Sequence, residues 1–215
     1  MLAFLHTAEV HVATFAGVVG RLEATAAIRH AVRVDLLAQA LADGGVSERT
    51  LRGTQAEVQR LVAEGARVVL CTCSTLGSAA EATPDVAGAR VLRVDRPMAE
   101  RAVALGRRIL LVAATQTGLS TAKALLRESA RERPAPPVEE LLCGEAWRLF
   151  EAGDHARYAE ALAREVERHA RAHDVVMLAQ ASMAPAAALV RRPDVELLTS
   201  PDLGVRAALS LLEER

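Results

Sequence analysis

The sequence predicts an α/β fold made of two related halves, each with a mostly parallel sheet flanked by helices. Short Val- and Leu-rich runs alternate with longer helical patterns along all 215 residues. These runs do not alternate strictly with polar residues, which is typical of parallel strands covered on both faces. Parts of the first half also recur in the second half, at an offset of about 107 to 108 positions.

The predicted strands are the apolar runs at 2–6, 32–36, 67–71, 89–94, 108–114, 175–179 and 195–198. The predicted helices lie between them, at 12–27, 48–64, 97–105, 120–132, 156–172 and 201–212. Ser47 and Asp154 are suited to cap the helices that follow them, because their side-chain oxygens accept from free helix N–H groups. We therefore expect a first α/β domain formed by 1–96 plus 200–215, and a second formed by 97–199.

The repeat is clearest at two strands and the loops that follow them. The segment RVVLCTCSTL at 67–76 aligns with DVVMLAQASM at 174–183, and each follows a helix that contains Glu-Val-x-Arg. The segment Leu-His-Thr at 5–7 likewise aligns with Ala-Ala-Thr at 113–115. The halves are therefore interpreted as two pseudo-symmetric, Rossmann-like or flavodoxin-like domains.

This duplication predicts where a ligand would bind. In open α/β sheets, ligands bind beyond the carboxyl ends of the strands. If the two halves face each other, four loops at 6–9, 73–76, 115–118 and 180–183 meet across one cleft. The loops are rich in small hydroxyl and amide side chains, which suit a small carboxylate or imide.

Cys73 is the candidate catalytic residue, because it follows an apolar strand and opens the turn Cys-Ser-Thr-Leu-Gly. If a helix begins between 74 and 77, its N-terminal dipole would lower the pKa of the thiol and favour the thiolate. A thiolate at this place can act as a proton acceptor or as a nucleophile. The alternative is a small, buried structural cysteine.

The other two cysteines are predicted to be structural. Cys71 lies in the strand, and Cys143 follows a pair of leucines. A Cys-x-Cys zinc site is an alternative for Cys71 and Cys73, but no second Cys or His pair lies at ligand spacing, so we expect no metal. Three cysteines without a disulfide pattern favour a reducing, cytoplasmic location.

The candidate binding residues are polar side chains that the repeat places in the four loops: His6, Thr7, Ser74, Thr75, Thr115, Thr117, Gln180 and Ser182. Each hydroxyl taken alone is as well explained as a helix cap. His6 either orients a substrate or is a histidine satisfied within the protein.

Composition excludes several classes of partner. The net charge is −1, with 26 basic and 27 acidic residues, so there is no basic excess to neutralise phosphates. Aromatic residues make up 2% of the chain, which leaves no stacking platform for bases. No apolar run approaches the roughly 20 residues that span a bilayer. We therefore expect neither a nucleic acid nor a membrane as partner.

These motifs resemble those of the aspartate/glutamate/hydantoin racemase superfamily. The segment RVVLCTCSTLG at 67–77 is similar to the first cysteine motif, in which an apolar strand leads into Cys-Asn-Thr or a close variant. The segment at 175–183 is similar to the second motif, and Ala-Ala-Thr-Gln-Thr at 113–117 to the threonine-bearing strand that opens the second half. The resemblance covers nearly the whole chain.

The resemblance implies a cofactor-free enzyme in which two cysteines flank the substrate Cα, one removing a proton and the other returning one. It identifies Cys73 as the first-half cysteine, and it implies that homo-oligomers are possible. Gln180 stands at the second cysteine position, and a neutral amide cannot exchange a proton at useful pH. Gln180 would instead donate a hydrogen bond to a carboxylate or enolate.

The sequence leaves three functions open. The leading hypothesis is a cofactor-independent racemase or isomerase acting at the Cα of a small carboxylic acid, amino acid or hydantoin-like compound. The second is a cofactor-free decarboxylase or lyase with a single cysteine, although the single-cysteine decarboxylases of the superfamily keep the second-half cysteine. The third is a non-catalytic relative that binds a small anion.

Overall fold

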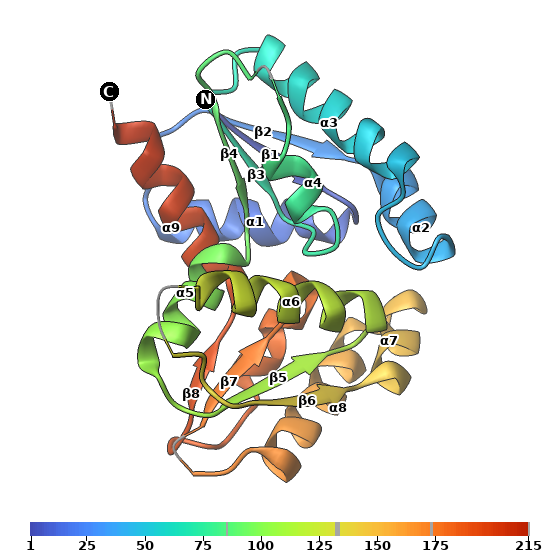
Figure 1. Ribbon diagram of the computed structural model, residues 1–215, viewed down its shortest axis with the longest axis vertical. Coiled ribbons are helices and arrows are strands. Elements are labelled where there is room, and N and C mark those ends of the chain that lie inside the picture. The colour runs from blue at the N-terminus through green and yellow to red at the C-terminus, as the bar shows by residue number, and fades with distance from the viewer. Residues whose placement is uncertain (85, 132–133, 173, 215) are drawn as a thin grey trace. The chain divides into compact units, whose positions relative to one another are not determined.

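The chain folds into two compact α/β units, Met1–Val94 with Pro201–Arg215, and Asp95–Ser200 (Figure 1). The computed structural model describes residues 1–84, 86–131, 134–172 and 174–214. The sequence predicts domains of 1–96 plus 200–215 and of 97–199. The cleft expected between the halves stays a prediction.

The first unit is built on a parallel sheet with the strand order β2-β1-β3-β4. Helix α1 contributes Phe15 to one face of this sheet, while α2 and α3 cover the other face with side chains such as Leu36 and Leu61. The elements are β1 (Leu2–His6), α1 (Val10–Arg21), β2 (Ile28–Val32), α2 (Val34–Ala42), α3 (Glu48–Ala63), β3 (Val68–Cys71), α4 (Gly77–Glu81), β4 (Arg90–Arg93) and α9 (Ser200–Glu213).

The second unit repeats this plan, with the strand order β6-β5-β7-β8 and parallel pairing throughout. Tyr158, Leu162 and Val166 of one helix pack with Leu110 and other strand residues in a single core. The elements are α5 (Arg96–Leu105), β5 (Ile109–Ala113), α6 (Gln116–Ser129), β6 (Val138–Leu142), α7 (Gly144–Glu151), α8 (His155–His169), β7 (Val175–Leu178), the 3₁₀ helix η1 (Ala181–Ala188) and β8 (Glu196–Leu198).

Strand register shows how closely the two units correspond. Leu2 pairs with Val68 in the first sheet, and Ile109 pairs with Val175 in the second, so both central strands are offset by 107 residues. The fold class predicted from the alternation and the repeat is therefore confirmed. The sequence alignment of the first loop was one residue out, because this register places Ala114, not Thr115, opposite Thr7.

Both edge strands next to the first strand of each unit differ from prediction. The segment 32–36 is not a strand, because β2 ends at Val32 and α2 begins at Val34. Strands β2 and β6 were missed since they are partly exposed and carry charged residues, so they lack an apolar run. The helix predicted at 12–27 ends early at Arg21 for the same reason. Of the helix predicted at 120–132, residue 132 lies outside the described residues.

Other local predictions are confirmed. Ser47 accepts from the Thr50 N–H at 3.3 Å, and Asp154 accepts from the Arg157 N–H at 3.2 Å, so each caps its helix. Trp147 packs against the core of the second unit. Within the described part of the chain, no helix is both long and apolar enough to cross a membrane.

Candidate active site

The polar residues of the first unit gather where β1 and β3 end, which we call the first edge (residues 6–7 and 72–76). Leu5 and Cys71 are paired in the parallel register, and the Thr72 N–H donates to the Leu5 carbonyl at 2.9 Å. Because the strands are neighbours, the residues that follow them lie side by side. The register therefore brings Thr7 to Cys73 across 66 residues of chain.

Cys73 is 7% exposed, and its sulfur is surrounded by hydrogen-bond donors. The hydroxyls of Thr7 and Thr75 and the backbone N–H groups of Thr75 and Leu76 all bond to it. Burial raises the pKa of the Cys73 thiol, and the four donors act in the opposite direction because they stabilise the thiolate. The resting group is thus a thiol that already faces the donors its anion needs.

The expected lowering of the Cys73 pKa by a helix dipole is wrong in its net direction. Helix α4 begins at Gly77 and has only five residues, so its dipole is small. Desolvation is the largest influence on the thiol and outweighs the bonds from the turn.

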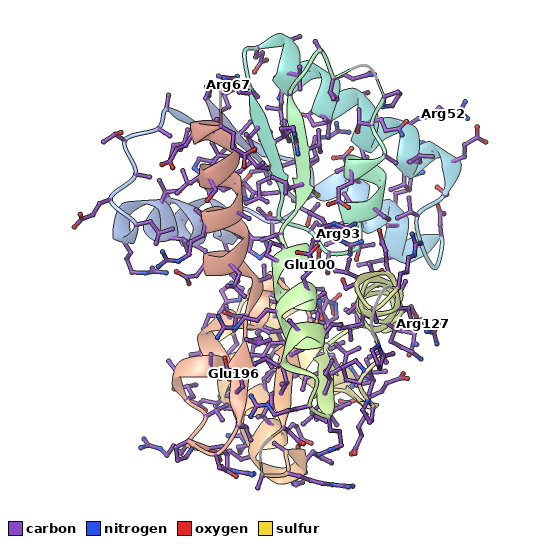
Figure 2. All side chains as sticks on the ribbon, turned by 60° about the vertical axis from the view of Figure 1, so that its left-hand side comes forward. Arg52, Arg67, Arg93, Glu100, Arg127 and Glu196 are labelled. Carbon is purple, nitrogen blue, oxygen red and sulfur yellow. The ribbon has the colours of Figure 1, made fainter. Side chains whose placement is uncertain are left out.

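A buried arginine supports the turn that holds Cys73. Arg93, the last residue of β4, is 3% exposed, and its guanidinium lies 3.4 Å from the Ser74 carbonyl, to which it donates (Figure 2). Gly77 lies against this side chain, since a Cβ at position 77 would come within 2.7 Å of the Arg93 Cβ. The Arg93 N–H donates to a Glu81 carboxylate oxygen at 3.2 Å. Sequence reasoning missed Arg93, which has no motif and is identified only by its burial.

The structure places the remaining predicted residues of the first unit at the same edge. Thr7, Ser74 and Thr75 are all buried, at 5 to 7% exposure. His6 is fully buried, and both of its ring nitrogens bond within the protein, to Thr72 and His30 at 2.8 Å each. Burial, followed by the influence of His30 and His11, lowers the pKa of His6 to about 3.

The second unit has an equivalent edge where β5 and β7 end, which we call the second edge (residues 113–118 and 179–182). The Ala179 N–H donates to the Val112 carbonyl at 2.9 Å, as the Thr72 N–H does to Leu5. Thr115 caps α6 by accepting from the Gly118 N–H at 3.0 Å. The Thr117 hydroxyl lies 3.3 Å from that of Thr115.

Gln180 follows Cys73 by the same 107 residues as the paired strands. Its Oε1 accepts from the Ala114 N–H at 2.7 Å, so the amide nitrogen is the end that is available to donate to a ligand. A Cβ at Gly118 would lie 3.2 Å from the Gln180 Cδ and 2.9 Å from the Thr115 Oγ1. Glycine at position 118 therefore lets the glutamine lie against the start of α6.

Ser182 contacts a residue that the sequence did not single out. Its Oγ lies 3.1 Å from the phenol oxygen of Tyr158 on α8, which is 1% exposed. Burial is the main cause that raises the pKa of Tyr158. Cys143 is also buried, and burial followed by Glu165 raises its pKa to about 11. Tyr158 is the only tyrosine, and that rarity was the one signal available in the sequence.

Metal binding finds no support in the described residues, in which no group of three or more His, Cys, Asp or Glu side chains is arranged to hold an ion. Cys71 lies in β3 and is fully buried, and its thiol donates to the Cys73 carbonyl at 3.6 Å. This geometry gives Cys71 a place in the strand core.

Comparison with solved structures identifies the fold. A glutamate racemase from Francisella tularensis subsp. tularensis SCHU S4, in complex with D-glutamate, matches with a TM-score of 0.71 and 14% identity, over 99% of this chain and 81% of that one. Picrophilus torridus aspartate racemase matches with 0.67 and 12%, over 100% and 93%. Allantoin racemase from Klebsiella pneumoniae matches with 0.64 and 15%, over 99% and 87%. The chain shares the fold of these racemases.

No family model matches the chain, and none of the curated proteins matches its sequence significantly. The resemblance read from the cysteine motifs is thus confirmed at the level of the fold. At 12 to 15% identity, the roles of single residues have to be argued from their own geometry.

Proposed function

We propose that the chain is a cofactor-independent, racemase-like enzyme that acts at the Cα of a small carboxylic acid, amino acid or hydantoin-like compound. The observation that supports this most is the Cys73 sulfur, which has four hydrogen-bond donors around it at the carboxyl end of a parallel sheet. The shared fold of glutamate, aspartate and allantoin racemases supports the class of reaction.

In the proposed step, the Cys73 thiolate takes the proton from the substrate Cα and becomes a thiol. The electron pair of the broken C–H bond moves toward the adjacent carbonyl and forms an enolate. Return of a proton from Cys73 to the same face restores the substrate, with exchange of the proton against solvent. The Thr7 and Thr75 hydroxyls stabilise the thiolate before and after each transfer.

Inversion of configuration needs a proton donor on the opposite face of the substrate. We assign this role to the groups of the second edge, which include the Thr115, Thr117 and Ser182 hydroxyls. The Gln180 amide cannot give up a proton at useful pH, but it can donate a hydrogen bond to the enolate oxygen. Exchange is therefore expected to be faster than inversion.

The test is exchange of the Cα proton in deuterium oxide, followed by NMR and mass spectrometry across a panel of amino acids and hydantoins. We expect exchange that is lost in Cys73→Ala and kept in Cys71→Ala, which removes a thiol two residues away. Absence of exchange with every compound, or exchange that survives Cys73→Ala, contradicts the proposal.

A second candidate function is favoured by Gln180. With a thiol at the first edge only, the chemistry of one face is complete: a substituted malonate loses carbon dioxide, and the resulting enolate takes one proton from Cys73. Release of carbon dioxide that disappears in Cys73→Ala, without Cα exchange of amino acids, would select this function. Binding of anions without either reaction would select a non-catalytic role.

A further inference from the structure

A chain of buried hydrogen bonds leads across the first sheet to the residue that precedes Cys73. The His30 Nδ1 lies 2.8 Å from the His6 Nε2, and the His6 Nδ1 lies 2.8 Å from the Thr72 Oγ1. The Thr72 hydroxyl donates in turn to the Leu5 carbonyl at 3.2 Å. His6 and Thr72 are 0% and 1% exposed, so water does not compete for these bonds.

The chain exists because three neighbouring strands place these side chains on one face. In the parallel register, His30 of β2 stands opposite Phe4, and His6 ends the same strand two residues later. The rings of His6 and His30 stack at 5.1 Å between centroids, and Phe4 stacks on His30 at 5.0 Å. This packing fixes both imidazoles in the planes that the hydrogen bonds need.

The orphan end of the chain decides which way its protons point. The His30 Nε2 is buried and has no hydrogen-bond partner among the described residues. A buried N–H without an acceptor costs more than a buried lone pair, so the proton of His30 belongs on Nδ1. His30 then donates to the His6 Nε2, His6 donates from Nδ1 to Thr72, and Thr72 donates to Leu5. In the reverse direction an N–H would be left unsatisfied.

We propose that His6 and His30 are positioning residues for Cys73, held as neutral Nδ1–H tautomers that lock the Thr72 hydroxyl at the start of the Cys73 turn. Thr72 is bound at both its N–H and its side chain to Leu5, so the turn leaves β3 in one direction. The catalytic meaning of this lock rests on the proposed function, whereas the lock itself does not.

A proton added to either ring breaks the lock, because the Nδ1–H of His30 would then face an N–H of His6, or His30 would become a buried cation. The groups that face His6 are His30 from β2, His11 from α1 and Thr72 from the end of β3. The two neighbouring imidazoles add to burial in lowering the pKa of His6. The lock is therefore kept at every pH at which a thiol reacts.

The first test reads the tautomers directly. Nitrogen NMR of the ¹⁵N-labelled chain at pH 7, with resonances assigned by His6→Asn and His30→Gln, should show a protonated Nδ1 and a bare Nε2 on both rings. A merely structural aromatic cluster has no reason to hold both histidines in this tautomer. A protonated Nε2 on either ring of the wild type overturns the proposed direction.

The second test measures how firmly the turn is held, as the rate at which iodoacetamide alkylates Cys73, localised by tandem mass spectrometry. Thr72→Val removes the hydroxyl at nearly constant volume, and loss of its bonds should raise the rate about tenfold by easing local opening. Thr72→Ser keeps the hydroxyl, and its rate should stay within about threefold of wild type.

The matched control is Phe15→Leu, which disturbs the packing around His6 without removing a hydrogen bond of the chain. Its alkylation rate should also stay within about threefold of wild type. Equal rates in Thr72→Val and Thr72→Ser, or an equal rise in Phe15→Leu, overturn the lock. Neither test uses a substrate, so a failed proton exchange refutes the proposed function alone.

Discussion

The two edges share a backbone plan but differ in chemistry at one pair of equivalent positions. At the first edge, the Thr7 hydroxyl bonds to the Cys73 sulfur. At the second edge, the equivalent pair is Ala114 and Gln180, and the backbone N–H of the one bonds to the side-chain oxygen of the other. In both units a residue after the first strand therefore controls a residue after the third.

This difference teaches that the duplication preserved the contact and changed the reactive group. A thiol and an amide oxygen both accept a hydrogen bond in this place, but only the thiol can take a proton from carbon at useful pH. The second edge keeps the ability to donate hydrogen bonds, through Gln180 and its hydroxyls. The four predictions below test this asymmetry, from the largest expected effect to the smallest.

Making both edges thiol-free should have the largest effect. Cys73→Ser should lower the rate of Cα proton exchange about 10⁴-fold, because a general base contributes up to that factor and a hydroxyl is a far weaker one. The measurement is deuterium uptake by NMR. Cys143→Ala removes the buried thiol of the second unit and should keep the wild-type rate, and a similar loss there would contradict the asymmetry.

The first edge should also be the acid-sensitive one. The folded pKa of His6, about 3, lies below its ordinary value of 6.5, so acid protonates the unfolded chain first. His6 therefore leaves stability unchanged above pH 6.5 and costs up to about 5 kcal/mol as the pH falls from 6.5 to 3.

His6→Phe should remove this part of the loss, measured as the free energy of urea unfolding between pH 7 and pH 4. His30, whose pKa is also lowered by burial, accounts for a smaller remaining slope. Phe15→Leu is destabilised without losing a titratable group, and its slope should match wild type. An unchanged slope in His6→Phe would show that His6 does not titrate as described.

Giving the second edge a thiol should restore two-sided chemistry. Gln180→Cys should raise the ratio of inverted to exchanged product about 100-fold, the lower range of a general acid. The ratio is read from chiral chromatography combined with deuterium content. Gln180→Ala, which removes the amide without adding a thiol, should leave the ratio near the wild-type value. Equal ratios in the two variants would mean that position 180 does not face the reacting carbon.

The smallest effect concerns the helices that leave the two edges. Thr115 caps α6 with its side chain, whereas Glu9 before α1 makes no side-chain cap. Thr115→Ala should therefore lower the free energy of unfolding by about 1 kcal/mol, and Glu9→Ala should change it by about zero. Urea titrations followed by circular dichroism give both values. An equal loss in both variants would show that the cap is not what distinguishes the helices.

The sequence by itself determined the central strands and the duplication. Strands β1, β3, β5 and β7 are covered on both faces, so burial demands the unbroken apolar runs that the sequence displays. The place of Cys73 follows from the same signal, since the polar turn begins where the apolar run stops. Edge strands β2 and β6 give no such signal, because their side chains are partly exposed and packing decides their state.

Only the tertiary structure decided which residues act together. Thr7 meets Cys73, and His30 meets His6, through strand register, and a register shift of one residue would turn each side chain to the other face. Burial likewise reversed the expected direction of the Cys73 pKa, because desolvation depends on atoms that are distant in the chain. The sequence named the thiol, and folding supplied the donors and the lock around it.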